Sequence, residues 1–328
     1  MNSHQTMAGA MLLALSLFAG LAAAQQISGS ITGVVQDPQA QVVPNARVTL
    51  INQAQGVTAM QAVTSQEGTF VFTPLLPAQY TVTVEAAGFK RYSRTDISLD
   101  ANQRLGIPPI ALEVGSPTEA ITVEANAVAL ETVSATRSGV VGQSQVNDLA
   151  MNGRNLGAVM RIVPGVQNDT STANGQAIGG QRTDQYTYTL DGVTMEDSGC
   201  GCFAFRYSVD SIAEITVATN GLAAEYGHSA GPQITVVSKS GTRAFHGTGY
   251  WFHRDESFNA NTYTNNLSNI ARPIYRYLTA GWNLGGPFYI PHLLNKNRDK
   301  VFFFVQHRQQ HGLFAMVRFA ICQRESHD

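Results

Sequence analysis

Three short runs of β-branched and aromatic residues constrain the middle of this chain, because each is closed by a turn signal. The runs are 186–190 before Asp191-Gly192, 214–218 before Asn220-Gly221, and 233–237 before Ser240-Gly241. Runs of this kind are typical of strands joined by loops. The stretch 176–241 therefore predicts a small sheet. The function of the chain should depend on what this sheet binds or what opening it fills.

Composition narrows the class of protein. The chain has 328 residues, of which 13% are charged, about half of the ~25% that is usual in soluble domains. Its polar surface must come from Ser, Thr, Asn, Gln and Gly, which favours an exported or outer-membrane β protein. The net charge of -2 gives no basic footprint for nucleic acid.

The N-terminus predicts export. Residues 8–21 form an apolar run, and Ala22-Ala23-Ala24 follows it, as in a signal peptide with its cleavage site. We assign residues 1–24 to this signal, although its first residues lack Lys and Arg. No later run has 18 consecutive apolar residues, so the mature chain could enter a membrane only as a β-barrel.

Residues 27–112 predict a first folded unit. Strand-like runs at 31–36, 46–52, 69–72, 79–85 and 97–99 are separated by turn signals. Val48 and Leu50 fall on one face of their run, as do Tyr80, Val82 and Val84, so two sheets should share a core. The segments ITGVVQDPQAQVVPNARVTL and TSQEGTFVFTPLLPAQYTVTVEAAGFK resemble the carboxypeptidase regulatory-like domain. This resemblance implies a transthyretin-like or carbohydrate-binding-like sandwich that is an accessory module without catalytic groups.

The sequence gives little support for an enzyme or a metal site. His253 and Glu256 have the H-x-x-E spacing of a zinc ligand pair, but positions three apart on a strand point to opposite faces. Cys200 and Cys202 fit ordinary loop residues, a local disulfide or a metal pair. We expect no enzyme activity, no catalytic residues, no cofactor and no metal.

The linker 113–127 contains a short β-prone segment, TEAITVEA. It resembles the TonB box of TonB-dependent outer-membrane receptors, which pairs through its backbone with a periplasmic energy-coupling protein. The resemblance assigns contact with that protein to Glu119, Ala120, Ile121, Thr122 and Val123. Strand addition requires β-prone residues and an open edge. A plain linker or a first strand of the next domain remains an alternative.

Residues 128–241 predict an α/β domain. Leu156, Val159, Met160 and Val163 have helical spacing and precede Pro164-Gly165, which indicates an amphipathic helix over 155–164. The ordered segments LAMNGRNLGAVMRIVPGV, GGQRTDQYTYTLDGV and SIAEITVATNGLAAEYGHSAGPQITVVSKSGT resemble the plug domain of TonB-dependent receptors. The domain order resembles that of the Oar type, which has a regulatory-like domain before its plug.

Several residues of this plug domain are assigned to turns. Asp191 and Gly192 should form a tight strand exit, and Tyr226, Gly227 and Gly241 should end or redirect the chain. In the family, the apical loops of the plug contact the substrate, which here implies residues 169–180 and 195–207. An unknown substrate remains open between an oligosaccharide, a siderophore and a peptide.

The pattern of residues 242–311 predicts the first strands of a β-barrel. In the run 277–284, Leu278, Ala280, Trp282 and Leu284 share one face and the more polar residues share the other, as in a transmembrane barrel or in a strand of a sandwich. The segments FHGTGYWFHRD, LTAGWNLGGPFYIP and KVFFFVQHR resemble the first strands of an Oar-type barrel. Residues 312–328 do not resemble the family.

The expected fold is therefore mainly β, with a sandwich, an α/β plug domain and an incomplete outer-membrane β-barrel. Transporters of this class use ~22 strands, and the residues after Gly241 are too few for them. We expect the N-terminal portion of an outer-membrane receptor that does not transport alone, either from a truncated product or from a frameshifted or partial gene. Its partners would be the coupling protein, lipid and substrate. A secreted or surface adhesin that binds carbohydrate or protein is the alternative.

Overall fold

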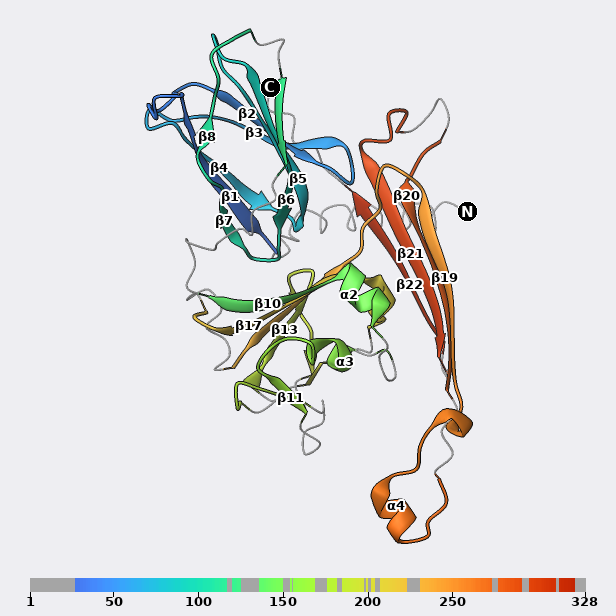
Figure 1. Cartoon of the computed structure of the whole chain (residues 1–328). Coiled ribbons are helices and arrows are strands. Elements are labelled where there is room, and N and C mark those ends of the chain that lie inside the picture. Colours follow the sequence, from blue (N-terminus) through green and yellow to red (C-terminus); the bar gives the residue numbers. More distant parts are fainter. Residues whose placement is uncertain are drawn as a thin grey trace, which may run out of the picture.

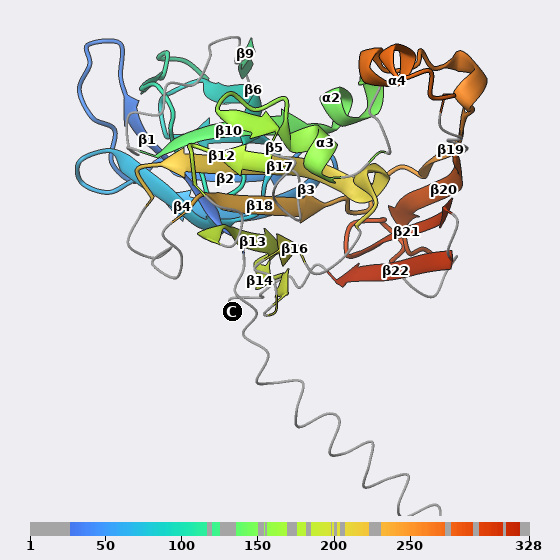
Figure 2. The ribbon, with the colours of Figure 1, turned by 90° about the horizontal axis from the view of Figure 1, so that it is seen from below.

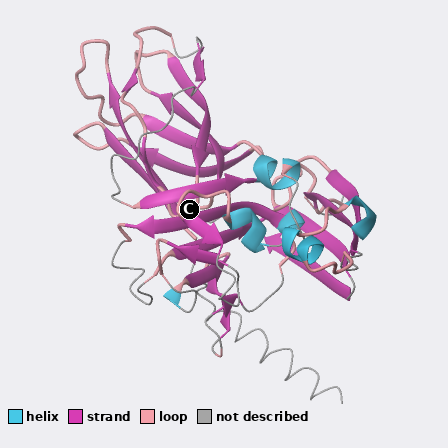
Figure 3. Cartoon of the chain, turned by 60° about the horizontal axis from the view of Figure 1, so that its bottom comes forward, coloured by secondary structure: helices cyan, strands magenta, loops and turns pink. Residues whose placement is uncertain are grey.

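The computed structural model contains three β-rich units (Figure 1). It describes residues 27–321 except 117–119, 125–135, 150–153, 155, 169–175, 182–184, 198, 200–201, 204–206, 223–230, 273–276, 291–294 and 311–312. The proposed signal peptide lies outside this range. Strands dominate all three units (Figure 3), so the mainly β fold is confirmed. In the described part, no helix is long and apolar enough to cross a membrane.

The first unit is a sandwich of two sheets. One sheet has the order β4-β1-β7, with β8 also paired to β1, and the other has the order β3-β2-β5-β6-β9. Their bounds are β1 Gly29–Gln36, β2 Arg47–Asn52, β3 Val57–Val63, β4 Thr69–Leu75, β5 Ala78–Glu85, β6 Arg91–Leu99, β7 Arg104–Gly106, β8 Ile110–Ala111 and β9 Ala120–Glu124.

The sandwich core follows the predicted alternation. Burial alternates along the whole of β1, and Val48, Leu50, Tyr80, Val82 and Val84 all lie in the shared core. The sequence analysis missed β3, whose burial pattern shows no fully buried residue. Its sequence VTAMQAV lacks the dense β-branched pattern of a core strand, and pairing with β2 holds it in the sheet.

The second unit, which we call the plug domain after the domain that its sequence resembles, is built on a five-stranded sheet with the order β10-β17-β18-β13-β14. Two short helices and two small hairpins flank it (Figures 1 and 2). The bounds are β10 Arg137–Gly142, α2 Gln143–Asp148, α3 Leu156–Met160, β11 Val166–Asn168, β12 Gln176–Ile178, β13 Thr187–Leu190, β14 Val193–Thr194, β15 Glu196–Asp197, β16 Cys202–Phe203, η3 Val209–Ser211, β17 Ile212–Asn220 and β18 Gln233–Ser238.

The predicted amphipathic helix is present but shorter than expected. Leu156, Val159, Met160 and Val163 are all buried in the plug core, as the spacing predicts. The helix α3 ends at Met160, and the chain continues through turns to Val163. The three predicted runs of the sheet correspond to β13, β17 and β18.

The third unit, which we call the wall, is a single antiparallel sheet with the order β19-β20-β21-β22. The bounds are β19 His246–Arg254, η5 Glu256–Phe258, α4 Tyr263–Leu267, β20 Tyr277–Pro287, β21 Val301–Gln310 and β22 Leu313–Ile321. The strand β22 was not predicted, and it pairs with β21 over nine residues. The four strands form an open sheet and not a closed barrel.

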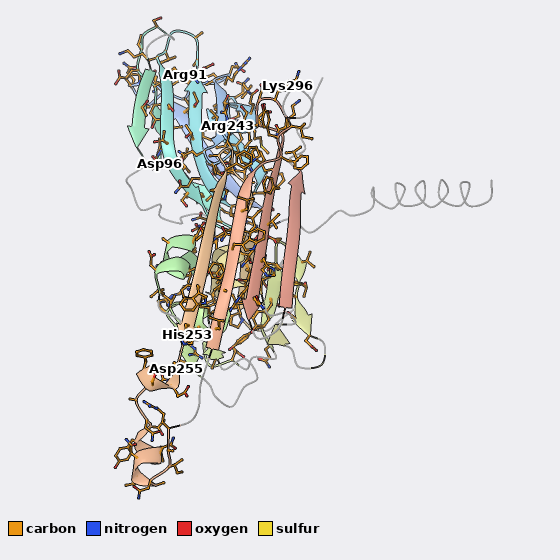
Figure 4. All side chains as sticks on the ribbon, turned by 90° about the vertical axis from the view of Figure 1, so that its right-hand side faces the viewer. Arg91, Asp96, Arg243, His253, Asp255 and Lys296 are labelled. Atoms are coloured by element: carbon orange, nitrogen blue, oxygen red, sulfur yellow. The ribbon has the colours of Figure 1, made fainter. Side chains whose placement is uncertain are left out.

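The sandwich and the long β19–β20 connection lie at opposite ends of the wall. Arg243 and Lys296 are at the end near the sandwich, whereas His253 and Asp255 are at the far end, from which the connection with α4 projects (Figures 1 and 4). The plug domain lies beside the wall between these ends. The wall therefore has one face toward the plug domain and one face away from it.

Candidate functional site

The proposed coupling segment is the edge strand of the sandwich. Ala120, Ile121, Thr122 and Val123 lie in β9, while Glu119 lies outside the described residues. The strand β9 runs parallel to β6, with Arg91 opposite Ala120 and Thr95 opposite Glu124 (Figure 2). The open edge that the sequence analysis expected is thus only half available, because β6 occupies one side of the strand.

The chain that enters this strand is also fixed to the sandwich. The backbone N–H of Lys90 donates to the carbonyl oxygen of Glu113 (2.8 Å), and the N–H of Gly115 donates to that of Gly88 (3.1 Å). The ammonium of Lys90 lies 3.5 Å from the carboxylate of Glu113. These contacts hold the residues before β9 against the turn that precedes β6.

The turn assigned to Asp191 and Gly192 is a two-residue hairpin between β13 and β14. Their φ angles are 50° and 86°, the conformation that such tight hairpins require and that Asp-Gly supplies. The Asp191 carboxylate also accepts from the N–H of Ser238 (3.0 Å). The side chain therefore links this turn to the end of β18. Tyr226 and Gly227 lie outside the described residues.

Gly241 lies where the plug domain joins the wall. A Cβ atom at this position would stand 2.4 Å from the carbonyl oxygen of Phe303 and 2.6 Å from that of Gly286. Both atoms belong to backbone, which cannot move aside as a flexible side chain can. Only glycine allows the chain to pass this close to β20 and β21.

A polar contact joins the plug domain to the inner face of the wall. On the plug side, Arg154 and Asp210 form a buried ion pair. The guanidinium of Arg154 lies 4.3 Å from the ring centre of Phe252 on β19, a cation–π distance. Its carbonyl oxygen accepts from Arg308 on β21 (3.3 Å).

A further hydrogen bond crosses the same boundary. The amide of Gln306 on β21 donates to the hydroxyl of Ser208 on the plug side (2.7 Å), and within the wall it donates to the hydroxyl of Tyr250 on β19 (3.1 Å). We call all of these residues the plug–wall contact, which comprises Arg154, Ser208, Asp210, Tyr250, Phe252, Gln306 and Arg308.

Lys239 brings further charge to the plug side of this contact. Its ammonium donates to the backbone carbonyl of Asp210 (2.8 Å). Burial lowers the pKa of Lys239, the Asp210 carboxylate opposes this change, and Arg154 adds to it. Arg154 and Lys239 thus both lie beside Asp210, and the Asp210 carboxylate is the negative charge that stabilises them on the plug side of the contact.

The sandwich contacts the plug domain through the loop after β6. The N–H of Ala101 donates to Oε1 of Glu214 (2.9 Å), and the amide of Asn102 donates to the hydroxyl of Thr235 (3.4 Å). Burial raises the pKa of Glu214, the hydrogen bonds from Ala101 and Thr216 oppose the rise, and Asp100 adds to it. A titratable group thus lies inside the boundary between these units.

The predicted apical loops are small hairpins whose tips lie partly outside the described residues. The strands β11 and β12 flank residues 169–175, and β15 and β16 flank residues 198–201. A shallow hollow lies beside the first hairpin and is lined by Ile178, Gly179, Gln181, Asn220, Gly221 and Pro232. Two of its lining residues, Ile178 and Gly179, belong to the predicted substrate loop 169–180.

Within the described ranges, no group of three or more His, Cys, Asp and Glu residues could hold a metal ion. His253 stacks on Trp251 with ring centres 5.9 Å apart. Cys202 is in β16, whereas Cys200 lies outside the described residues, so the question of their pairing stays open.

The sequence analysis did not identify the plug–wall contact or Glu214. Arg154 and Asp210 are 56 residues apart in sequence, and the contact with Ala101 spans 113 residues. The one local signal was the presence of charged residues within otherwise apolar or β-prone segments of a chain with few charges.

Two protein-family models match the chain. The carboxypeptidase regulatory-like domain matches residues 30–113, which is nearly the whole sandwich. The outer membrane beta barrel domain matches residues 237–312, which include β19 to β21. These matches place the chain among outer-membrane proteins.

The chain is also similar to individual known proteins. The chain is 28% identical over 256 residues to the TonB-dependent transporter Oar of Myxococcus xanthus, which covers 72% of this chain and 23% of that protein. Solved structures that resemble it include the siderophore receptor PirA from Acinetobacter baumannii (17% identity, TM-score 0.40, 53% of this chain and 24% of that one). The outer-membrane transporter YddB from Escherichia coli has 15% identity and a TM-score of 0.40 over 53% of this chain and 26% of that one. The chain spans about a quarter of the length of each.

The buried ion pair predicts a large effect of Asp210→Asn. This change leaves the Arg154 guanidinium buried without its counter-charge, which typically costs about 3–5 kcal/mol. Hydrogen exchange of the β17 and β18 amides should show opening that is easier by about this amount. Asp148→Asn removes an exposed carboxylate from the same domain and should leave exchange unchanged. Equal exchange in both variants would contradict the role of the pair.

The raised pKa of Glu214 predicts a pH-dependent effect of Glu214→Gln. As pH rises above the ordinary pKa of a glutamate, about 4, the folded chain holds this proton more tightly than the unfolded chain, so ionisation weakens the wild-type fold. The glutamine variant keeps an acceptor oxygen and should gain stability relative to wild type as pH rises in this way, measured as the urea midpoint. Glu67→Gln, at an exposed residue whose pKa is lowered by Ser65, should not reproduce the trend. A stability difference that is constant with pH would reject the assignment.

Proposed function

We propose that this chain, a homologue of the TonB-dependent transporter Oar, supplies the sandwich, the plug domain and the first wall strands of a TonB-dependent outer-membrane receptor. The proposal rests above all on the pattern of burial in the wall. The remaining steps concern its orientation, its coupling and its substrate.

The strand β20 has the burial pattern that lipid requires, although Phe302 and Phe304 of β21 are buried. On β20, Leu278, Trp282 and Leu284 are exposed, while Thr279 and Asn283 between them are buried. A sheet of a water-soluble protein has the opposite arrangement, with apolar residues inward. Apolar residues outward and polar residues inward are typical of a transmembrane barrel. This is the observation that carries the proposal.

The neighbouring strand continues the same outward surface. Trp251 on β19 lies opposite Ala280 on β20, and Gly249 lies opposite Trp282, so both tryptophans belong to one face of the sheet. They are 68% and 47% exposed, and they are the two tryptophans of the chain. The four strands have 9 to 11 residues, which matches the ~9–11 residues of a membrane-spanning strand.

The elements at the two ends of the wall support an orientation of the chain in the outer membrane. The sandwich with β9 lies at one end of the wall, and the long β19–β20 connection extends from the other (Figures 1 and 4). Long loops of outer-membrane barrels are on the extracellular side. The sandwich then faces the periplasm, where a TonB-type energy-coupling protein can reach β9.

Transport requires a barrel with more strands than the four of the wall. The sheet ends at β19 and β22 among the described residues, and an open sheet edge is not stable in lipid. We propose that passage of a substrate requires further strands that close the wall around the plug domain. The substrate class stays open between an oligosaccharide, a siderophore and a peptide.

Tryptophan fluorescence tests the proposed wall, since both tryptophans lie on its outward face. In a chain that is extended by tryptophan-free strands closing the wall and is reconstituted in vesicles whose acyl chains carry bromine, the fluorescence of both should be quenched. Leu284→Arg should weaken this quenching, because a charge on the lipid face costs about 2–4 kcal/mol near the membrane centre.

Leu267→Arg gives the matched control, because Leu267 is an exposed leucine of α4 outside the wall. It should leave quenching by bromine unchanged. Tryptophans that are quenched by iodide in water but not by brominated lipid would refute the receptor wall.

A further inference from the structure

We infer that the energy-coupling protein binds β9 while β9 remains part of the sandwich sheet. This inference rests on the proposed function, and it specifies the surface through which coupling occurs. The partner is a polypeptide that contributes one extended strand, and its site is the edge of β9 that faces away from β6.

The sheet topology leaves this edge available. The strand β9 ends the order β3-β2-β5-β6-β9, and within the described ranges no strand pairs with its far side. In a parallel pair, alternate residues direct both backbone groups toward one neighbour. Pairing with β6 therefore uses about half of the backbone groups of β9, and the other half face outward for a second strand.

The surroundings of β9 favour retention of β6 over its displacement. Five residues of β9 are in register with Arg91–Thr95 of β6. The preceding chain is held by the backbone contacts of Glu113 and Gly115 and by the Lys90–Glu113 ion pair. The coupling segment is thus built into the sandwich, and a partner would not need to break these contacts in order to bind.

This arrangement gives the sandwich a part in recognition. A strand that is already extended loses less conformational freedom on binding than a flexible peptide does. Strand addition to an existing sheet edge draws its affinity from main-chain hydrogen bonds. The side chain of Thr122 is exposed, so at this position the partner's strand can approach without displacing a packed side chain.

A reversible cross-link between β6 and β9 tests the inference. The background is the full chain with Cys200, Cys202 and Cys322 changed to Ser. The test pair is Ser93→Cys on β6 with Thr122→Cys on β9, because Ser93 and Thr122 lie opposite each other. Adjacent strands bring Cα atoms within the range that a disulfide accepts. The pair Thr49→Cys with Gln61→Cys, on β2 and β3, is the matched control.

The probe is the purified periplasmic domain of a TonB protein, and its affinity is measured by calorimetry. The test pair should oxidise, and the oxidised chain should bind within about threefold of the reduced chain, as for the control pair. A synthetic peptide of residues 116–126 should bind at least about tenfold more weakly than the chain, because it must first become extended.

Each other result would overturn the inference in a distinguishable way. A test pair that does not oxidise would contradict the β6–β9 pairing. A tenfold or greater loss of binding on oxidation, absent in the control pair, would show that the partner displaces β6. Absence of binding in every form would remove the proposed coupling function and the inference with it.

Discussion

The placement of apolar side chains on the outside of the wall is the constraint on which the rest of the structure depends. Leu278, Trp282 and Leu284 face away from the plug domain, and Thr279 and Asn283 face toward it. Lipid on one side and a polar protein surface on the other satisfy both faces. The plug domain meets the wall through hydrogen bonds and a cation–π contact, and the wall also has buried aromatic residues, Phe302 and Phe304 on β21.

The three units are joined at a small number of specific points. Gly241 passes against the backbone of β20 and β21, Glu214 accepts from the sandwich loop, and the N–H of Arg243 donates to the carbonyl oxygen of Ala54 (3.1 Å). Polar boundaries of this kind can open more readily than an apolar core. On the proposed arrangement, a load applied at β9 reaches the plug domain through the sandwich loop as well as through the chain.

The features that sequence analysis could predict are those with a local cause. The alternation in 277–284 is visible because successive strand residues meet only two environments. The Asp191-Gly192 turn and the apolar spacing of Leu156, Val159 and Met160 are likewise fixed by neighbours in sequence. These signals were sufficient for β1, β2, β4 and β5 of the sandwich, for β13, β17 and β18 of the plug domain and for β19 to β21 of the wall, but not for β10 or the short strands of the plug domain.

Features that arise from distant contacts were not predictable in the same way. The pairing of β9 with β6, the Arg154–Asp210 ion pair and the burial of Glu214 depend on residues that only the tertiary fold brings together. The strand β3 was missed because pairing with β2, rather than its own sequence pattern, places it in the sheet. In each case the local sequence was compatible with both a buried or paired position and an exposed one, and contacts with distant residues determined which of them the structure has.

The most direct test of the wall is a scan of nitroxide labels, attached one at a time to positions 278–284 in a cysteine-free chain that is extended by strands closing the wall and is reconstituted in lipid. The account predicts that collisions with oxygen, which concentrates in lipid, are frequent at positions 278, 280, 282 and 284 and rare at 279, 281 and 283. Uniform accessibility to a water-soluble relaxation agent, or the opposite alternation, would contradict it.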